Sequence, residues 1–353
     1  MVLAAIGVIV ALLLPLSRPY DIEVFLRAGA AVLHGLRLYP QPGSPAVFSG
    51  SSFVYPYLAA LPFVPLAAVS AHTGVIVFFI VSVAAVIAAC LTDPRHDPWL
   101  ALLVLCASFT IIGLQLGSLS PLLFAGAVFM WRLRDRPVAF AVVAAGVVVA
   151  KLFLAPVLLW PLLAGRRRAF AYATALTTLS VGVGFAAGPL GPASYLQLLS
   201  QLGSHEARAG FGLIGALMNA GFSATVAQAC AAALAATIVA ASYLNWRRTH
   251  DERVLYCAGI TASLLASPVL WSHYLVLVAA ALLAAGAPRR WFVALALGSW
   301  AIALPHGLHP SAGGPRGPSF GAWLAVLLSI TVPLYAAARG WRPRISVAAR
   351  DRA

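Results

Sequence analysis

The chain has 353 residues, of which 62% are hydrophobic and 9% are charged. A soluble domain carries about a quarter of its residues as charged side chains, so this composition excludes an ordinary soluble protein and predicts a domain embedded in a membrane. The formal net charge of +14 comes from arginines in short clusters between apolar segments. That pattern is typical of topology signals and contacts with membrane lipids, not of nucleic-acid binding.

The chain begins with an apolar segment, residues 2–17, that is predicted to be a retained helix. No basic region precedes it and no small-residue cleavage site follows it, in contrast to a signal peptide. A long loop, residues 18–55, comes next, and residues 21–36 within it have the pattern of an amphipathic helix.

Further apolar runs follow along the chain. They cover residues 56–70, 74–91, 98–113, 120–131, 138–150, 152–164, 169–188, 224–244, 254–267, 273–287, 291–304 and 320–338. Several are shorter than the roughly 20 residues of a full crossing, and the run 56–70, which contains Pro62 and Pro65, is expected to be re-entrant or interfacial. We predict an all-α polytopic membrane protein with about 11 to 13 transmembrane or re-entrant helices.

The arginine clusters predict how these helices are oriented. Cytoplasmic loops are enriched in Lys and Arg, and one assignment places seventeen arginines inside against five arginines and Lys151 outside. The inner clusters are Arg132/Arg134/Arg136, Arg166/Arg167/Arg168, Arg247/Arg248/Arg253, Arg289/Arg290 and the tail from Arg339 onward. The runs 138–150 and 152–164 then form a hairpin with Lys151 at its outer bend. Because the long loops all fall outside, we expect the functional site on the extracytoplasmic face.

Three residues on that face are candidates for chemistry. Asp21 is either a capping or interface residue of the helix 21–36 or a general base at the membrane edge. Lys151, the only lysine in the chain, either extends to the outer headgroups or binds a phosphate. His273 follows a Ser-Pro break and is either a core histidine bonded to backbone or a functional one.

Other outer residues allow fewer inferences. The aromatic residues Tyr39, Phe53, Tyr55, Tyr57, Trp271 and Tyr274 are an interfacial belt by default, with a sugar-binding platform as the alternative. Asp21, Glu23 and Glu206 are the only outer carboxylates, fewer than a hard-cation site normally has, so no metal or other cofactor is predicted.

A series of motifs resembles glycosyltransferase family 87. In chain order these are Asp21, Gly35-Leu-Arg-Leu-Tyr39, Phe53-Val-Tyr55-Pro56, Lys151 with Pro156 and an Arg-rich turn, and Ser267-Pro-x-x-Trp271-x-His273-Tyr. The sequence departs from the family pattern where Ser118 follows Gly117 and where Phe25 replaces a tyrosine. The resemblance implies a C-type glycosyltransferase-like bundle in a bacterial plasma membrane, with one domain over residues 1–340 and a basic cytoplasmic tail over 341–353.

The resemblance also implies a reaction. The donor would be a polyprenyl-phosphate-linked hexose, mannose by analogy with known members, and the acceptor a lipid or glycan. Asp21 would be the general base of an inverting transfer. We expect the donor phosphate to be bound by Lys151 and His273, with Arg27, Arg37 and Arg208 as further candidates, and the acceptor or sugar by Glu23, Tyr39, Tyr55 and Trp271.

Two other functions stay open at this point. A polytopic transporter or lipid flippase would also be apolar and basic, but transporters commonly place ionisable groups near the bilayer midplane and contain internal repeats. A non-catalytic relative or assembly subunit would be indicated if Asp21 pointed into lipid or away from any cavity.

Overall fold

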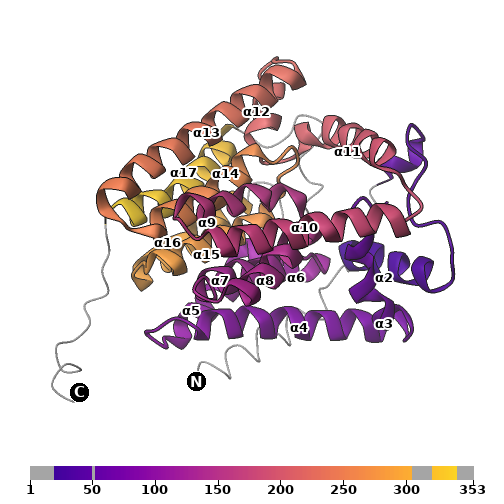
Figure 1. Cartoon of the computed structure of the whole chain (residues 1–353), viewed down its shortest axis with the longest axis horizontal. Coiled ribbons are helices and arrows are strands. Elements are labelled where there is room, and N and C mark those ends of the chain that lie inside the picture. Colours follow the sequence, from indigo (N-terminus) through magenta and orange to yellow (C-terminus); the bar gives the residue numbers. More distant parts are fainter. Residues whose placement is uncertain (1–19, 50–51, 304–319, 340–353) are drawn as a thin grey trace.

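The computed structural model describes residues 20–49, 52–303 and 320–339, which form helices and loops without a strand (Figure 1). The predicted helix 2–17 and the tail 341–353 lie outside the described residues. The helices of the first half are α2 (Tyr20–Leu33), η2 (Pro45–Phe48), η3 (Tyr57–Phe63), α3 (Val64–Ala67), α4 (Ala71–Leu91), α5 (Pro98–Cys106), α6 (Ser108–Leu116), α7 (Ser120–Arg132), α8 (Pro137–Ala150), η4 (Leu152–Leu158) and α9 (Leu159–Leu163). Those of the second half are α10 (Arg167–Ala187), α11 (Pro192–Glu206), η5 (Ala207–Ala209), α12 (Leu213–Asn219), α13 (Ala224–Thr249), α14 (Glu252–Ala266), η6 (Ser272–Leu275), α15 (Val276–Ala285), α16 (Arg289–Ala303) and α17 (Phe320–Ala338).

Three of the described helices, α4, α10 and α13, are long and apolar enough to cross a membrane. A fourth crossing is formed if α5 and α6, bent by 69° relative to each other, act as one broken span. Shorter apolar helices surround them, including α8, the pair η4 and α9, and the pair η6 and α15. These features are those of a helical membrane protein, while the total of 11 to 13 helices stays a prediction.

The break between α5 and α6 divides the predicted run 98–113. Ala107 has an extended backbone there, and α16 supplies partners for the polar groups that the break leaves unpaired. The Ser108 N–H donates to the Ser299 hydroxyl at 2.8 Å, the Ser108 hydroxyl donates to the Ser299 carbonyl at 2.7 Å, and the Trp300 indole donates to the Cys106 carbonyl at 2.9 Å. A helix interruption at membrane depth needs such partners because water is absent.

Lys151 is at the bend of a helical hairpin formed by α8 on one side and η4 with α9 on the other. The Trp160 ring of α9 lies 5.7 Å from the Phe140 ring near the start of α8, so the second arm returns along the first. Arg166, just after α9, donates to the Asp135 carboxylate before α8 at 2.8 Å. The hairpin therefore starts and ends at the same end of the bundle, and Lys151 lies at the other.

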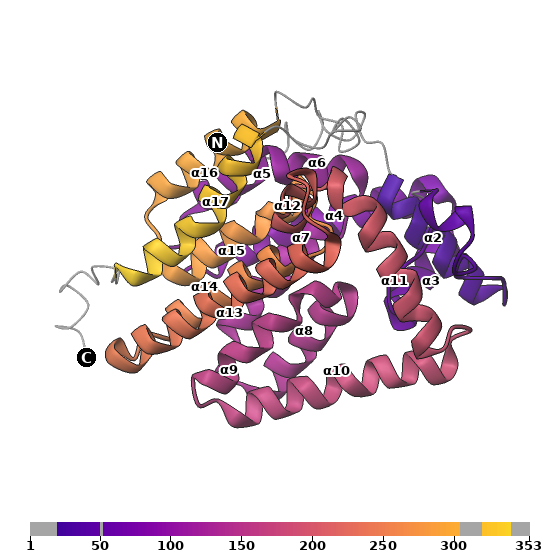
Figure 2. The same cartoon turned by 90° about the horizontal axis from the view of Figure 1, so that it is seen from above.

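The molecule has two chemically different ends. The turns with arginine clusters meet at one, where Arg95 donates to the Ala287 carbonyl at 2.6 Å and Arg166 to Glu252 at 2.7 Å. Helices α2 and α3 lie at the other together with α11, as Figures 1 and 2 both show, and η3 packs against α2 and α3. We call these the arginine end and the Asp21 end.

Two segments at the Asp21 end can be compared with the sequence analysis, which treated residues 188–223 as a loop and residues 56–70 as re-entrant or interfacial. Residues 188–223 contain α11, η5 and α12, and α11 buries Tyr195 and Leu198, with the Tyr195 hydroxyl donating to the Val54 carbonyl in the loop before η3. The run 56–70 forms η3 and α3, which together are too short for a crossing. Apolar side chains of both segments are buried in the bundle, although neither segment is helical and apolar over a sufficient length to span a membrane.

Candidate active site

Asp21 is the second residue of α2, and a glycine contact determines where this helix starts to pack. The neighbouring Ile22 is completely buried against Gly117 in the turn between α6 and α7. Gly117 has φ +67°, and a Cβ there would lie 2.5 Å from the Ile22 Cγ2. Only glycine therefore combines the left-handed backbone with this close approach, which brings the half-buried Asp21 to the α6–α7 turn.

Ser118, the next residue of that turn, is positioned to bind the carboxylate. Its N–H donates to the Gly113 carbonyl at 2.8 Å, which closes the C-terminus of α6. Its hydroxyl accepts a hydrogen bond from the Ser120 N–H at 3.2 Å, and hydrogen bonding from this side chain lowers the pKa of Asp21. Ser118 therefore favours the ionised form of the candidate base, at the position where the sequence departs from the family pattern.

Lys151 lies between two aromatic rings. Its Nζ is 4.3 Å from the centroid of the Tyr55 ring and 5.0 Å from that of Tyr274. An ammonium group over aromatic faces is attracted by their negative quadrupoles. The rings hold the lysine head in place without neutralising its charge, so the charge remains for an anionic ligand.

The charges of Asp21 and Lys151 act on each other in a poorly hydrated environment. Burial raises the pKa of Asp21 from 3.8 to about 6, and the nearby Lys151 charge and the Ser118 hydrogen bond only partly oppose that rise. Burial lowers the pKa of Lys151, in the bend outside the helices, from 10.5 to about 8, against the opposing effect of Asp21 and Glu206. Such shifts toward neutral pH are common at catalytic sites and suit proton transfer near pH 7.

Glu206, the last residue of α11, is the member of this cluster to which the sequence analysis assigned no role. Burial raises its pKa, and the charge of Lys151 partly opposes the shift. No motif marks Glu206, and it lies far from Asp21 and Lys151 in the sequence. The sequence did indicate that Glu206 is one of three carboxylates on the outer face, and this was the feature that could have made it a candidate.

His273, in η6, packs against α6 near Gly113. It is 2% exposed, and neither ring nitrogen has a hydrogen-bond partner among the described residues. A Cβ on Gly113 would lie 3.5 Å from the His273 Cβ and 2.5 Å from the Ser120 hydroxyl. The hydroxyls of Ser120 and Thr110 are likewise buried without partners within the described part of the chain. Buried polar groups normally have partners, so the His273 and Ser120 side chains, which both lie beside Gly113, are suited to a polar ligand or water.

Two tyrosines fix the backbone beside Lys151. The Tyr39 hydroxyl donates to the Tyr55 carbonyl at 2.8 Å, and the Tyr195 hydroxyl donates to the Val54 carbonyl at 3.1 Å. The Phe25 ring of α2 lies 4.6 Å from the Tyr55 ring. Tyr39 therefore acts on the position of Tyr55, and Phe25 contributes packing at the place where the family pattern has a tyrosine.

The other predicted ligands lie at the edge of this cluster. Glu23 and Arg27 form an exposed ion pair at 3.9 Å along α2. Glu23 comes two residues after Asp21, and side chains two apart on a helix point in different directions, so Glu23 and Asp21 do not share a face. Arg37 and Arg208 are exposed, and Trp271 is half-buried directly before η6. The structure thus brings together Asp21, Ser118, Lys151, Tyr55, Tyr274 and Glu206, with His273 next to them.

The comparison with protein families identifies the chain. The model of glycosyltransferase family 87 matches residues 53–268, which is more than half of the sequence. The chain belongs to glycosyltransferase family 87. The matched range includes Tyr55, Ser118, Lys151 and Glu206, whereas Asp21 precedes it and His273 follows it. No curated protein and no solved structure matches.

Membership of family 87 makes the chain a membrane glycosyltransferase, and its substrates are a sugar donor and an acceptor. Such a transfer needs a base for the acceptor hydroxyl and a positive or hydrogen-bonding environment for the leaving group. The cluster around Asp21 and Lys151 contains both kinds of group.

Proposed function

We propose that this glycosyltransferase moves a hexose, mannose by family analogy, from a polyprenyl-phosphate donor to a hydroxyl of a lipid or glycan acceptor. The observation that carries the proposal is that the Asp21 carboxylate, with a pKa of about 6, and the Lys151 ammonium group lie in one cluster. This cluster is at the end of the molecule opposite the arginines. Because arginine-rich turns face the cytoplasm, the reaction takes place on the extracytoplasmic side of the bacterial plasma membrane.

Asp21 is the general base in this proposal. At pH 7 most of the Asp21 side chains are ionised, since the pKa is about 6, and each can take the proton of the acceptor hydroxyl. The acceptor oxygen attacks the anomeric carbon as the bond from that carbon to the phosphate oxygen breaks, and the polyprenyl phosphate leaves with the electron pair. This single displacement inverts the anomeric configuration.

Lys151 stabilises the departing phosphate. Its ammonium group is held by Tyr55 and Tyr274 at 4.3 and 5.0 Å and has no direct ion pair among the described residues, so an anion can contact it. His273 adds a buried imidazole without a partner in the described structure, which can donate a hydrogen bond to a phosphate oxygen. Stabilising charge at the leaving group is among the largest contributions to such catalysis.

The remaining predicted ligands have secondary roles. Tyr55 and Trp271 offer aromatic surface for the sugar, and Tyr39 holds Tyr55 through its carbonyl. Arg37 and Arg208 are exposed. We assign them, like Arg27, to outer contacts with the single phosphate of the donor. Glu23 is assigned to the acceptor, on the outer side of α2.

The position of the acidic residues favours this function over transport. Each acidic residue that the structure describes lies in a loop or in the first or last turn of a helix. A transporter would normally place ionisable groups near the bilayer midplane.

The test is sugar transfer from a radiolabelled polyprenyl-phosphate hexose by membranes containing the wild type or Asp21→Asn. We expect kcat to fall by about 10²- to 10⁴-fold, the usual contribution of a general base. The control is Asp135→Asn, which removes an exposed carboxylate (67% exposed) at the arginine end. Undiminished transfer by Asp21→Asn would refute the assignment of the base.

Stability measurements separate this effect from misfolding. The folded pKa of Asp21 is raised, so its contribution to stability is present below pH 3.8 and is lost as the pH rises through about 6. The ionised side chain therefore opposes folding at pH 7, and Asp21→Asn should unfold at no lower temperature than the wild type. An equal loss of activity and of thermal stability would indicate a structural role instead.

A further inference from the structure

A cavity of about 440 Å³ lies at the arginine end, bounded by the turns that connect α4 to α5, α7 to α8, α9 to α10, α13 to α14 and α15 to α16. This volume lies within the range of small-ligand sites, about 300 to 1,000 Å³. Ser118 lies just before the 13-residue helix α7 and Arg132 is its last residue, so the cavity is about 20 Å from the Asp21 cluster at 1.5 Å per residue. It is separate from the proposed active site.

The residues that line the cavity carry an excess of positive charge. Five are arginines and three are acidic, and the set is Arg95, Arg132, Arg134, Arg166, Arg253, Asp93, Asp251 and Glu252. Arginines that no carboxylate separates repel one another, and a bound anion would reduce that repulsion. The excess of arginines over acidic residues therefore favours an anionic ligand.

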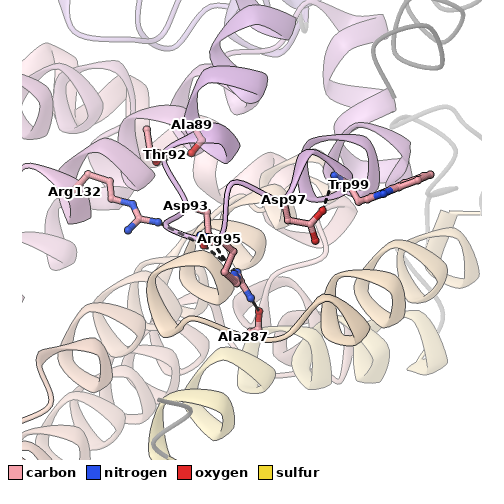
Figure 3. A network of polar contacts seen from close by, with 8 residues as sticks. All are labelled: Ala89, Thr92, Asp93, Arg95, Asp97, Trp99, Arg132 and Ala287. Carbon is pink, nitrogen blue, oxygen red and sulfur yellow. Dashed lines mark hydrogen bonds and ion pairs between the residues drawn. The ribbon is translucent and has the colours of Figure 1, made fainter. Parts of the chain in front are cut away.

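Three of the arginines are engaged by carboxylates. Arg95 binds Asp93 through two nitrogens, at 2.7 and 2.9 Å, and also donates to the Ala287 carbonyl (Figure 3). Arg166 donates to Glu252 at 2.7 Å, and Arg253 binds Asp251 at 2.6 and 2.7 Å. These contacts join helix ends and account for the three acidic residues.

Arg132 and Arg134 have donors left over. The closest carboxylate contact of Arg132 is Asp93 at 3.6 Å, and its buried Nε has no hydrogen-bond partner among the described residues. The guanidinium of Arg134 lies 4.2 Å from the Trp131 ring and donates to the Trp131 carbonyl at 2.8 Å, while Asp135 is 4.0 Å away. Two guanidinium groups with unused donors therefore line the same cavity.

We propose that this cavity binds a phosphate group between Arg132 and Arg134. A phosphate offers several strong acceptor oxygens, and planar guanidinium groups bind it in a bidentate manner. The basic turns place the cavity at headgroup level, so an anionic phospholipid is the source that we favour, and free phosphate is the other source of the same chemistry.

The experiment is native mass spectrometry of the purified, delipidated protein titrated with phosphatidylglycerol, diacylglycerol or inorganic phosphate. We expect phosphatidylglycerol to bind to the wild type and to bind about tenfold or more weakly to Arg132→Gln and Arg134→Gln, since each loses charged hydrogen bonds. The matched control is Arg136→Gln, which removes an exposed arginine of the same turn that does not line the cavity. Diacylglycerol has the same tails without the phosphate and should not compete.

The outcomes separate the possibilities. Binding of inorganic phosphate with the same dependence on Arg132 and Arg134 supports the phosphate site and assigns it to the free anion. An equal loss in Arg136→Gln, equal binding of diacylglycerol, or unchanged binding by both site variants overturns the proposal. If Arg132→Gln does not fold, as judged by thermal unfolding, Arg134→Gln decides, because the Arg134 side chain is more exposed (29% against 21%) and its ion pair is with the exposed Asp135 at 4.0 Å.

Discussion

The two ends of the molecule treat buried charge in opposite ways. At the arginine end Asp93 is 2% exposed and is bound by the Arg95 side chain and backbone N–H. Burial alone would raise the pKa of Asp93, but the hydrogen bonds from Arg95 and the charges of Arg95 and Arg132 outweigh it, and the pKa is lowered. At the Asp21 end burial outweighs the nearby charge, and the pKa of Asp21 rises.

This difference separates structural from chemical use of charge. A carboxylate with several short hydrogen bonds stabilises the fold and resists protonation. A desolvated carboxylate without a direct ion pair opposes folding, and such residues are found mainly where chemistry needs them. Charge-removing substitutions should therefore cost stability at the arginine end and activity at the Asp21 end.

The largest expected effect is on stability, from Asp93→Asn. The substitution leaves Arg95 and Arg132 without their carboxylate, and breaking a buried ion pair costs about 3 to 5 kcal/mol. Because Arg95 is 31% exposed, we expect about 2 to 4 kcal/mol after screening by solvent. The measurement is denaturant unfolding in detergent, with the exposed Asp135→Asn as a control of about 0 to 1 kcal/mol. Equal losses in both variants would contradict the distinction between buried and exposed pairs.

Next in size is the effect of Lys151→Met on activity. Loss of a charged contact to the phosphate should lower kcat/KM for the donor by about 10- to 100-fold, equivalent to about 1.5 to 3 kcal/mol. The depressed pKa of Lys151 means that its charged form opposes folding below about pH 8, so stability at pH 7 should not fall. The exposed Arg168→Gln is the control. A lower unfolding temperature with an unchanged kcat/KM would assign Lys151 to structure.

A smaller effect is expected in the pH dependence of kcat/KM. The rate should rise with pH through about 6, as Asp21 ionises, and fall above about 8, as Lys151 loses its charge. The two groups interact, so the profile reports the pair. In the wild type, hydrogen bonding from Ser118 lowers the pKa of Asp21. Ser118→Ala removes it, so the pKa of Asp21 should rise and the lower limb of the profile should move to higher pH. A limb that stays in place or moves to lower pH would show that Asp21 does not control it.

The smallest expected effect comes from Tyr39→Phe. It removes the hydrogen bond to the Tyr55 carbonyl, worth about 1 kcal/mol in stability, and loosens the ring under Lys151. We expect a modest rise in the donor KM with little change in kcat, measured by steady-state transfer assays. Tyr195→Phe, which frees the neighbouring Val54 carbonyl, is the matched comparison. A fall in kcat without a change in KM would instead place Tyr39 in the chemical step.

Local features of the sequence were sufficient for the coarse architecture. The apolar composition predicted a helical membrane protein, and the spacing of the arginine clusters predicted the hairpin with Lys151 at its bend, which the structure contains. These properties depend on composition and on charge beside each apolar run. The motif order also indicated family 87, which the family match confirms.

The composition of the site depends on contacts between distant segments. The interruption at Ala107 is possible because Ser299 and Trp300 provide hydrogen bonds from almost 200 residues away. Glu206 joins Lys151 because residues 188–223 fold into helices that pack on the bundle. From the sequence alone, the apolar runs and their charges determined a membrane bundle with a polar end. Tertiary packing decided which carboxylates stay unpaired there, because desolvation depends on neighbours that no local pattern specifies.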